Sequence, residues 1–265
     1  MYDFNYQRAA TVADASAKIK ASDDGMLMAG GMTLIPTLKQ RLAQPADVID
    51  LGGISDLVGI SVDGDVVTIG AMTTHATVAA SAEVKGKIPA LAELADGIGD
   101  PQVRNRGTIG GSIANNDPAA DYPSACVGLG ATIITDKREI SADDFFVGMF
   151  ETALEESEVV TAVKFPKPSK AAYMKFPNPA SRYAIVGVFV SEGSDGCRVA
   201  VTGAGQNGVF RVDEMESALT SNFSADAVAS IVISDDDLNS DIHASAEYRA
   251  HLVTVMAKRA VTKAG

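Results

Sequence analysis

Two glycine-rich segments contain the residues of this 265-residue sequence that are best suited to hold a ligand through the backbone. Residues 27–36 read LMAGGMTLIP, and residues 108–117 read TIGGSIANND. In each segment, paired glycines stand beside hydroxyl-bearing residues, within or directly after an apolar run. Because glycine has no Cβ and adopts positive φ readily, successive N–H groups can converge on one phosphate. Two such segments predict a dinucleotide that is held from both sides.

The polar residues near the glycines indicate which part of a ligand each would bind. Thr33 can cap a helix whose positive end attracts a phosphate. Thr108 and Ser112 supply hydroxyl donors, whereas Asp117 and Asp121 supply acceptors. Carboxylates repel phosphate, so the natural partners of these two residues are the hydroxyls of a ribose or ribityl chain.

Each glycine pair also has a simpler interpretation, as a tight turn or as a connector between a strand and a helix. Neither segment fits the GxGxxG fingerprint of dinucleotide-binding folds, and neither has the lysine of a Walker loop. Neither of these two common nucleotide sites is therefore supported.

The first glycine segment is expected within a small α/β unit. Residues 11–14 (TVAD) resemble a capping box that opens a helix. The apolar residues 26–29 predict a buried strand that enters the glycines, and residues 48–51 predict another strand. A second helix is predicted to begin near Thr33. Its expected apolar face consists of Leu34, Ile35, Leu38 and Leu42.

Mixed strands and helices are predicted around the second glycine segment. The predicted strands are residues 66–70, 131–135, 139–140 and 159–165, and the predicted helices are residues 88–98 and 123–129. Pro89 and Pro123 stand at the helix starts, where the missing N–H costs nothing. This mixture predicts an α+β fold rather than a regular doubly wound parallel sheet.

Residues 166–170 (PKPSK) predict the main domain boundary, because two prolines and polar residues interrupt apolar runs there. We expect an N-terminal domain of residues 1–165, with subdomains 1–55 and 56–165, and a C-terminal domain of residues 171–265. In the C-terminal domain the predicted strands are residues 173–176, 183–190 and 198–202, forming a three-stranded sheet. The predicted helices there are residues 214–219, 225–232 and 244–262.

Composition and charge argue against several classes of protein. A net charge of −12 disfavours broad nucleic-acid binding. No apolar run approaches the ~20 residues that a membrane span needs, and no secretory signal is recognised, so we expect a cytoplasmic protein. The two cysteines, Cys126 and Cys197, are too few for an iron–sulfur cluster and are expected to be buried. The three histidines lack metal-site spacing, and no metal ligand is assigned.

Several motifs together make the sequence recognisable. The main ones are AGGMTLIP (29–36), TIGGS (108–112) and DPAADYP (117–123). Further matches are LAQP (42–45), IDL (49–51), GAMTTH (70–75), QVRNRG (102–107), YMKF (173–176) and PASRYA (179–184). In these motifs the chain resembles the FAD-binding, or medium, subunit of the molybdenum hydroxylases, the family of aerobic carbon monoxide dehydrogenase and xanthine dehydrogenase. The resemblance runs in order along nearly the whole chain.

The resemblance implies a set of FAD-binding residues and no catalytic residue. The backbone of residues 29–34 would bind the pyrophosphate, residues 108–112 would form a second wall, Asp121 would accept a cofactor hydroxyl, and Lys175 would lie at the edge of the flavin site. The implied residues are Ala29, Gly30, Gly31, Met32, Thr33, Leu34, Thr108, Gly111, Ser112, Asn116, Asp117, Asp121 and Lys175.

The chain departs from the family pattern at two positions. Met32 stands where such subunits frequently carry a histidine, and Ile98 stands where xanthine dehydrogenases carry an aromatic residue. His75 is interpreted as a structural hydrogen-bonding residue rather than an acid or base, and its position predicts noncovalent FAD. Arg104 and Arg106 either reach the cofactor or a partner subunit, or lie at a helix end on the surface.

The resemblance also implies a function and partners. The family oxidises substrates at a molybdenum centre in another polypeptide, and electrons leave through iron–sulfur clusters to FAD and an external acceptor. The expected partners are a small subunit with 2Fe–2S clusters and a large subunit with molybdopterin, assembled as a dimer of heterotrimers. Two alternatives remain: a stand-alone flavin oxidoreductase with its own substrate pocket, and a cofactor-free interaction subunit with the same fold.

Overall fold

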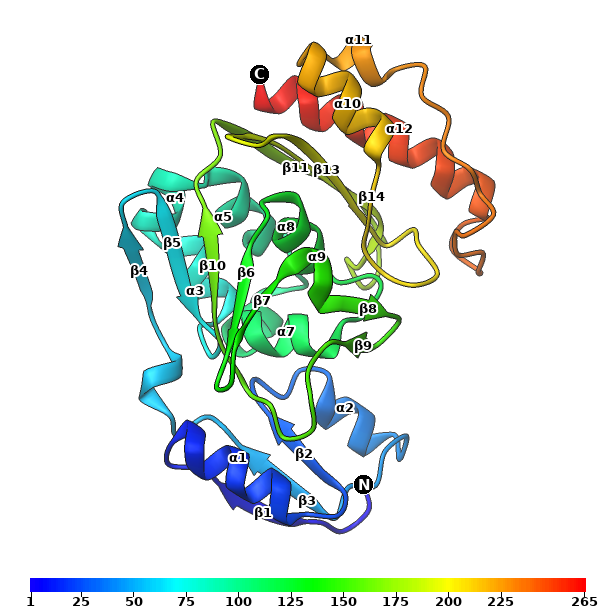
Figure 1. The fold of residues 1–265 in the computed structure, drawn as a ribbon. Helices are drawn as coiled ribbons and strands as arrows, with labels where there is room; N and C mark the ends of the chain where they lie inside the picture. The colour runs from blue at the N-terminus through cyan, green and yellow to red at the C-terminus, as the bar shows by residue number, and fades with distance from the viewer.

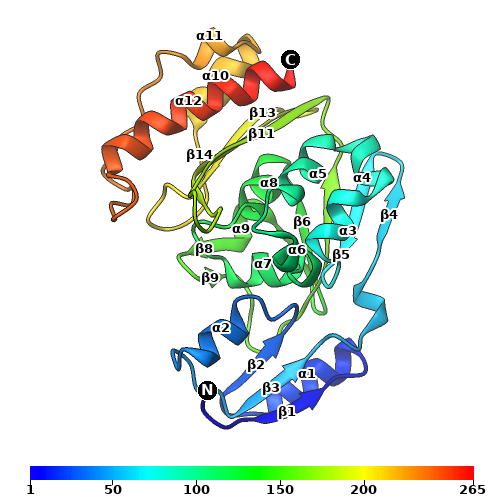
Figure 2. The ribbon, with the colours of Figure 1, turned by 180° about the vertical axis from the view of Figure 1, so that it is seen from behind.

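Three separate hydrophobic clusters divide the protein into three packed units that follow one another from bottom to top in Figure 1. The computed structural model describes residues 1–265. An N-terminal lobe lies at one end of the molecule, a central domain lies in the middle, and a C-terminal domain lies at the other end. The order is the same when the molecule is seen from behind (Figure 2).

The N-terminal lobe is a three-stranded parallel sheet with the strand order β1-β3-β2. Its elements are β1 (Asn5–Arg8), α1 (Val12–Ala21), β2 (Gly25–Met28), α2 (Leu34–Lys39) and β3 (Asp47–Asp50). The parallel pairing requires a crossover between successive strands, and α1 supplies the one between β1 and β2. The predicted small α/β unit is confirmed.

The two helices of this lobe begin differently. Thr11 caps α1 as the capping box predicts, with its Oγ1 accepting from the N–H of Asp14. Thr33 precedes α2 but forms no capping hydrogen bond, so the predicted cap there is wrong. The predicted apolar face is also too long, because α2 ends at Lys39 and Leu42 is 74% exposed.

The central domain is built on a five-stranded antiparallel sheet with the order β4-β5-β10-β6-β7. Its strands are β4 (Ile60–Asp63), β5 (Val66–Gly70), β6 (Thr132–Thr135), β7 (Glu139–Ser141) and β10 (Val160–Pro166), and β8 (Phe146–Gly148) and β9 (Glu151–Thr152) form a separate hairpin. A 3₁₀ turn, η1 (Ser55–Leu57), leads into it, and its helices are α3 (His75–Ala80), α4 (Ala82–Lys87), α5 (Pro89–Asp96), α6 (Pro101–Arg106), α7 (Ile109–Asn115), α8 (Tyr122–Gly128) and α9 (Ala142–Phe145).

The C-terminal domain is a four-stranded antiparallel sheet between two layers of helices. Its elements are β11 (Lys170–Pro177), β12 (Ala184–Gly193), β13 (Gly196–Thr202), β14 (Phe210–Arg211), α10 (Asp213–Ser221), α11 (Ala225–Val228) and α12 (Ala246–Ala264). Helices α10 and α12 pack on the sheet, and α5 and α8 of the central domain also contact it (Figure 1). The prediction of three strands missed β14, a two-residue edge strand.

Burial agrees with the predicted fold class, an α+β arrangement in two larger parts. Strand β12 is almost wholly buried, because helices cover the sheet from both sides. Cys126 and Cys197 are free thiols and both are buried, as predicted. Measured by length and hydropathy, none of the helices could span a lipid bilayer.

Candidate functional site

A cavity of about 620 Å³ lies where the three units meet, a volume within the range of ligand sites. Residues 25–27 and 29–34 line it from the N-terminal lobe. Helix α7 and the loop after it line it from the central domain, and residues 181–183 line it from the C-terminal domain. Both glycine segments therefore face the same space, although they are about 80 positions apart in the sequence.

The first glycine segment presents an uninterrupted row of backbone donors. None of the N–H groups of residues 29–34 donates to a backbone acceptor in the protein. Gly31 has a φ of 74°, a left-handed conformation that favours glycine, and this residue turns the chain from β2 into α2. A row of free N–H groups beside a cavity is suited to an anion such as a pyrophosphate.

The second glycine segment is a helix rather than the expected loop. Helix α7 begins directly after Thr108, whose Oγ1 accepts from the N–H of Gly111 at 3.2 Å. The N–H groups of Ile109 and Gly110 donate to carbonyls of the segment that follows β5. Three of its first N–H groups are therefore occupied within the protein, which corrects the expectation that both segments offer phosphates the same donors.

The close approach of neighbouring chain segments explains the glycines better than a need for free N–H groups does. A Cβ on Gly111 would lie 3.2 Å from the Cβ of Ala29, and a Cβ on Gly30 would lie only 1.9 Å from the carbonyl oxygen of Arg106. The N-terminal lobe therefore packs against the central domain through glycine backbone at this point. The glycines set how closely the two walls of the cavity can stand.

The donor set fits the FAD expected from the sequence. Residues 29–34, whose N–H groups have no backbone acceptor in the protein, line the cavity on one side, and Thr108 and Ser112 line it on the other. The carboxylates of Asp117 and Asp121 line the same cavity and can accept hydrogen bonds from sugar or ribityl hydroxyls. Donors for a pyrophosphate and acceptors for hydroxyls therefore share one space.

Asp121 joins the central and C-terminal domains at the cavity wall. Its buried carboxylate accepts from the Tyr173 hydroxyl at 2.5 Å and from the Nζ of Lys175 at 3.1 Å. Burial raises the pKa of Asp121, and the charge of Lys175 opposes that effect. Lys175 also donates to the carbonyl of Gly97 at 2.9 Å and does not line the cavity, so it lies behind Asp121.

Asp117 and Asn116 differ in their access to the cavity. Asp117 lines it and accepts from the N–H of Ala119 at 2.9 Å, and burial raises the pKa of its carboxyl. Asn116 ends α7 in a left-handed conformation and does not line the cavity. Its amide instead donates to the carbonyls of Gly148 and Glu151, each at 2.8 Å, and holds the β8–β9 hairpin.

His75 lines the cavity and is 4% exposed. Burial, and next the charge of Arg104, lower its pKa to about 4, so the ring is neutral at pH 7. Its Nδ1 is buried without a hydrogen-bond partner, so the structural hydrogen bond expected of this residue is not formed there. Arg104 donates to the carbonyls of Ile98 and Gly99, both on the cavity wall.

Several cavity residues were not found from the sequence. Ser181, Arg182 and Tyr183 lie in the β11–β12 turn and belong to the PASRYA motif (179–184), from which the sequence predicts no binding role. Arg182 has a φ of 63°, unusual for a residue other than glycine. A cluster of polar residues directly before the apolar strand β12 was the available signal. Leu154, Glu158 and Val159 form a further part of the wall.

Comparison with protein families identifies both parts of the chain. Residues 2–168 match the model described as "FAD binding domain in molybdopterin dehydrogenase". Residues 171–264 match the model described as "CO dehydrogenase flavoprotein C-terminal domain". Together the two matches cover almost the whole sequence.

Individual proteins resemble the chain over its full length. The nicotine 6-hydroxylase medium subunit of Paenarthrobacter nicotinovorans is 36% identical, with 98% of this chain and 96% of that protein covered. The carbon monoxide dehydrogenase medium chain of Hydrogenophaga pseudoflava is 34% identical over 98% and 96% of the two chains. In the reconstituted CO dehydrogenase from Oligotropha carboxidovorans, one chain matches with a TM-score of 0.91 and 33% identity, over 99% and 98% of the two chains.

Proposed function

Because the chain belongs to the FAD-binding medium subunits of the molybdenum hydroxylases, we propose that it holds FAD in the cavity between its units and passes electrons from iron–sulfur clusters to an external acceptor. The observation that carries the proposal is that residues 29–34, whose N–H groups have no backbone acceptor, line a cavity of about 620 Å³. FAD supplies chemistry that accepts one or two electrons, which converts single-electron delivery into a two-electron output.

The side chains and backbone of this chain bind and orient the cofactor. The N–H groups of residues 29–34 donate to the pyrophosphate, together with the hydroxyls of Thr33 and Ser112. Asp117 and Asp121 accept from cofactor hydroxyls. Lys175 and Asn116 do not line the cavity: Lys175 donates to Asp121, and Asn116 links the end of α7 to the β8–β9 hairpin. Binding is noncovalent in this proposal.

Each domain has its own role in the proposed function. Residues 1–165 hold the cofactor, with subdomains 1–55 and 56–165 on its two sides, and residues 171–265 close the cavity through the β11–β12 turn. Free buried thiols support a reducing compartment, and we propose the cytoplasm.

The partners must carry the groups that this chain lacks. With two cysteines, the sequence cannot ligate an iron–sulfur cluster alone. The relatives are named as medium subunits or medium chains. We propose a small subunit with 2Fe–2S clusters and a large subunit with molybdopterin, assembled as a dimer of heterotrimers. The substrate is then decided in the large subunit.

The test is to isolate the native complex through an affinity tag on this chain. We expect FAD in equimolar amount with the chain, fully released into the supernatant by acid precipitation, and two further subunits that carry iron and molybdenum. Sedimentation should give the mass of two heterotrimers. A complex without flavin would refute the cofactor role. Turnover of an organic substrate by this chain alone would instead support the stand-alone oxidoreductase, which no comparison favours.

A further inference from the structure

The N-terminal lobe is held against the rest of the protein by few polar contacts. Between residues 1–54 and residues 58–265 there is one hydrogen bond, from the Oγ of Ser16 in α1 to the carbonyl oxygen of Ser157 at 3.0 Å. The cavity lies between this lobe and the central domain, so the placement of the lobe sets the distance between the two glycine segments.

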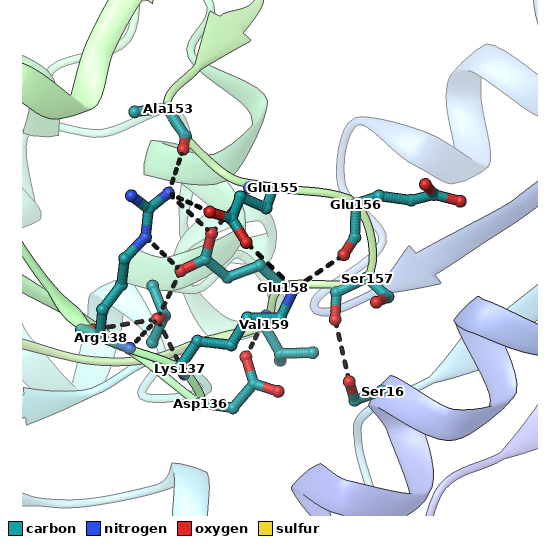
Figure 3. Close-up of polar contacts among 11 residues, drawn as sticks. Ser16, Asp136, Lys137, Arg138, Ala153, Glu155, Glu156, Ser157, Glu158 and Val159 are labelled. Carbon is teal, nitrogen blue, oxygen red and sulfur yellow. Dashed lines mark hydrogen bonds and ion pairs between the residues drawn. The ribbon is translucent and has the colours of Figure 1, made fainter.

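The partner in this bond belongs to residues 153–159, which we call the strap. The strap connects the β8–β9 hairpin to β10, and its Leu154, Glu158 and Val159 line the cavity. Ser157 has a φ of 60°, a costly conformation for a residue other than glycine, and its carbonyl points to α1 (Figure 3). A strained residue persists only where its surroundings fix it.

Glu158 supplies that fixation. Its carboxylate accepts four hydrogen bonds: from the Thr135 hydroxyl at 2.7 Å, from Nε and Nη2 of Arg138 at 3.1 Å each, and from the N–H of Glu155 at 2.7 Å (Figure 3). The side chain has no exposed surface. Burial alone would raise the pKa of Glu158, but these hydrogen bonds together lower it to about 2, so it is ionised at every physiological pH.

The β6–β7 hairpin, which contains Thr135 and Arg138, also holds the strap at other points. Arg138 donates from Nη2 to the carbonyl of Ala153 at 2.7 Å, and Lys137 donates to the carbonyl of Glu156 at 3.0 Å. At the far end, the carboxylate of Asp136 accepts from the N–H of Val159 at 2.8 Å. The turn between β6 and β7 therefore forms hydrogen bonds along the whole strap, and the buried Glu158 accepts several of them.

We propose that Glu158 is a positioning residue for the cofactor. Through the strap it presents the Ser157 carbonyl to Ser16, and it thereby fixes the N-terminal lobe at the spacing that lets both glycine segments reach one FAD. Glu158 itself need not touch the cofactor. The inference rests on the proposed FAD-binding function and adds a residue that controls the width of the site.

The experiment compares two buried glutamates in the full chain. Glu158→Gln keeps the size of the side chain but places an amide donor among N–H donors. Glu216→Gln is the matched control: Glu216 pairs with Arg211 and accepts from the N–H of Val199 inside the C-terminal domain, away from the cavity. Thermal unfolding of the apo protein reports the general loss of stability for each variant.

FAD affinity and the visible circular dichroism of bound flavin report the positioning effect. We expect Glu158→Gln to raise the dissociation constant of FAD at least tenfold and to change the dichroism, while Glu216→Gln stays within twofold at a comparable loss of thermal stability. Ser16→Ala should raise the constant about threefold, the effect of one hydrogen bond. In the Glu158→Gln background, Ser16→Ala should have no further effect, because the carbonyl is already misplaced.

Two results would overturn the inference. One is an equal change of FAD affinity in the Glu158 and Glu216 variants, which would make Glu158 a general stability residue. The other is a double variant in which the dissociation constant of FAD rises by the product of the two single effects, which would make Glu158 and Ser16 independent. A wild-type chain and complex that bind no FAD would instead refute the proposed function, so the two failures are distinguishable.

Discussion

Replacing Gly30 by alanine tests whether the spacing of the two walls controls cofactor binding. A Cβ at this position would lie 1.9 Å from the carbonyl oxygen of Arg106, and Cβ contacts below 3.0 Å are not tolerated. The first glycine segment must therefore retreat by about 1.1 Å, the difference between these two values. The clash is with backbone, so no side-chain rotation relieves it.

The magnitude follows from the hydrogen bonds that such a shift would break. A donor–acceptor distance near 2.9 Å that lengthens by about 1 Å is no longer a hydrogen bond. Bonds from N–H groups to a charged acceptor contribute roughly 1.5–3 kcal/mol each. Loss of two of them therefore costs about 3 kcal/mol or more, which corresponds to about a hundredfold weaker binding of FAD.

Titration of the apo protein with FAD, followed by flavin fluorescence, measures this loss. Gly86→Ala is the control, because a Cβ at this helical position meets nothing within 4 Å. We expect the control to leave FAD affinity unchanged and to stabilise the protein by about 0.5–1 kcal/mol. A Gly30→Ala variant that binds FAD within threefold of the wild type would refute the reasoning.

Three further predictions concern the residues around the cavity. Lys175→Met should destabilise the protein by about 3–5 kcal/mol in thermal or denaturant unfolding, because Asp121 loses its buried counter-charge; Asp121→Asn should cost less. The pKa of His75 is about 4 in the folded protein and 6.5 ordinarily, so between these values the ring is protonated only in the unfolded chain. The free energy of unfolding should therefore fall as the pH drops from 6.5 to 4. His75→Gln should remove up to about 1.4 kcal/mol per pH unit of that dependence. Asn116→Ala leaves two hairpin carbonyls without their donor and should destabilise the protein by about 1–3 kcal/mol and speed amide exchange across the β8–β9 hairpin.

Local patterns in the sequence predicted elements whose causes are local. The capping hydroxyl of Thr11 and the apolar runs that form β2, β3 and β12 lie where expected, because capping and alternation act over a few residues. Helix α7 was missed because two glycines in its first turn have poor helix propensity. Contacts to Ala71 and Thr73, about 40 residues away in the sequence, stabilise that turn instead.

Cavity-lining residues were predicted only where they lie in continuous motifs. Residues 29–34 and 108–121 carry recognisable patterns, and most of the residues assigned from them do line one cavity. Tyr183 and Glu158 also line the cavity. Tyr183 comes from the C-terminal domain, and Glu158 comes from a loop with no motif of its own. Their placement depends on pairing between distant strands, which composition and periodicity do not encode.

The cavity takes its walls from residue 25 through residue 183, which has a consequence for biosynthesis. A ribosome delivers the N-terminal lobe first, but this lobe offers only one side of the pocket. The opposing helix emerges later, and the covering turn comes later still. The proposed binding of FAD in this cavity would therefore require a nearly complete polypeptide.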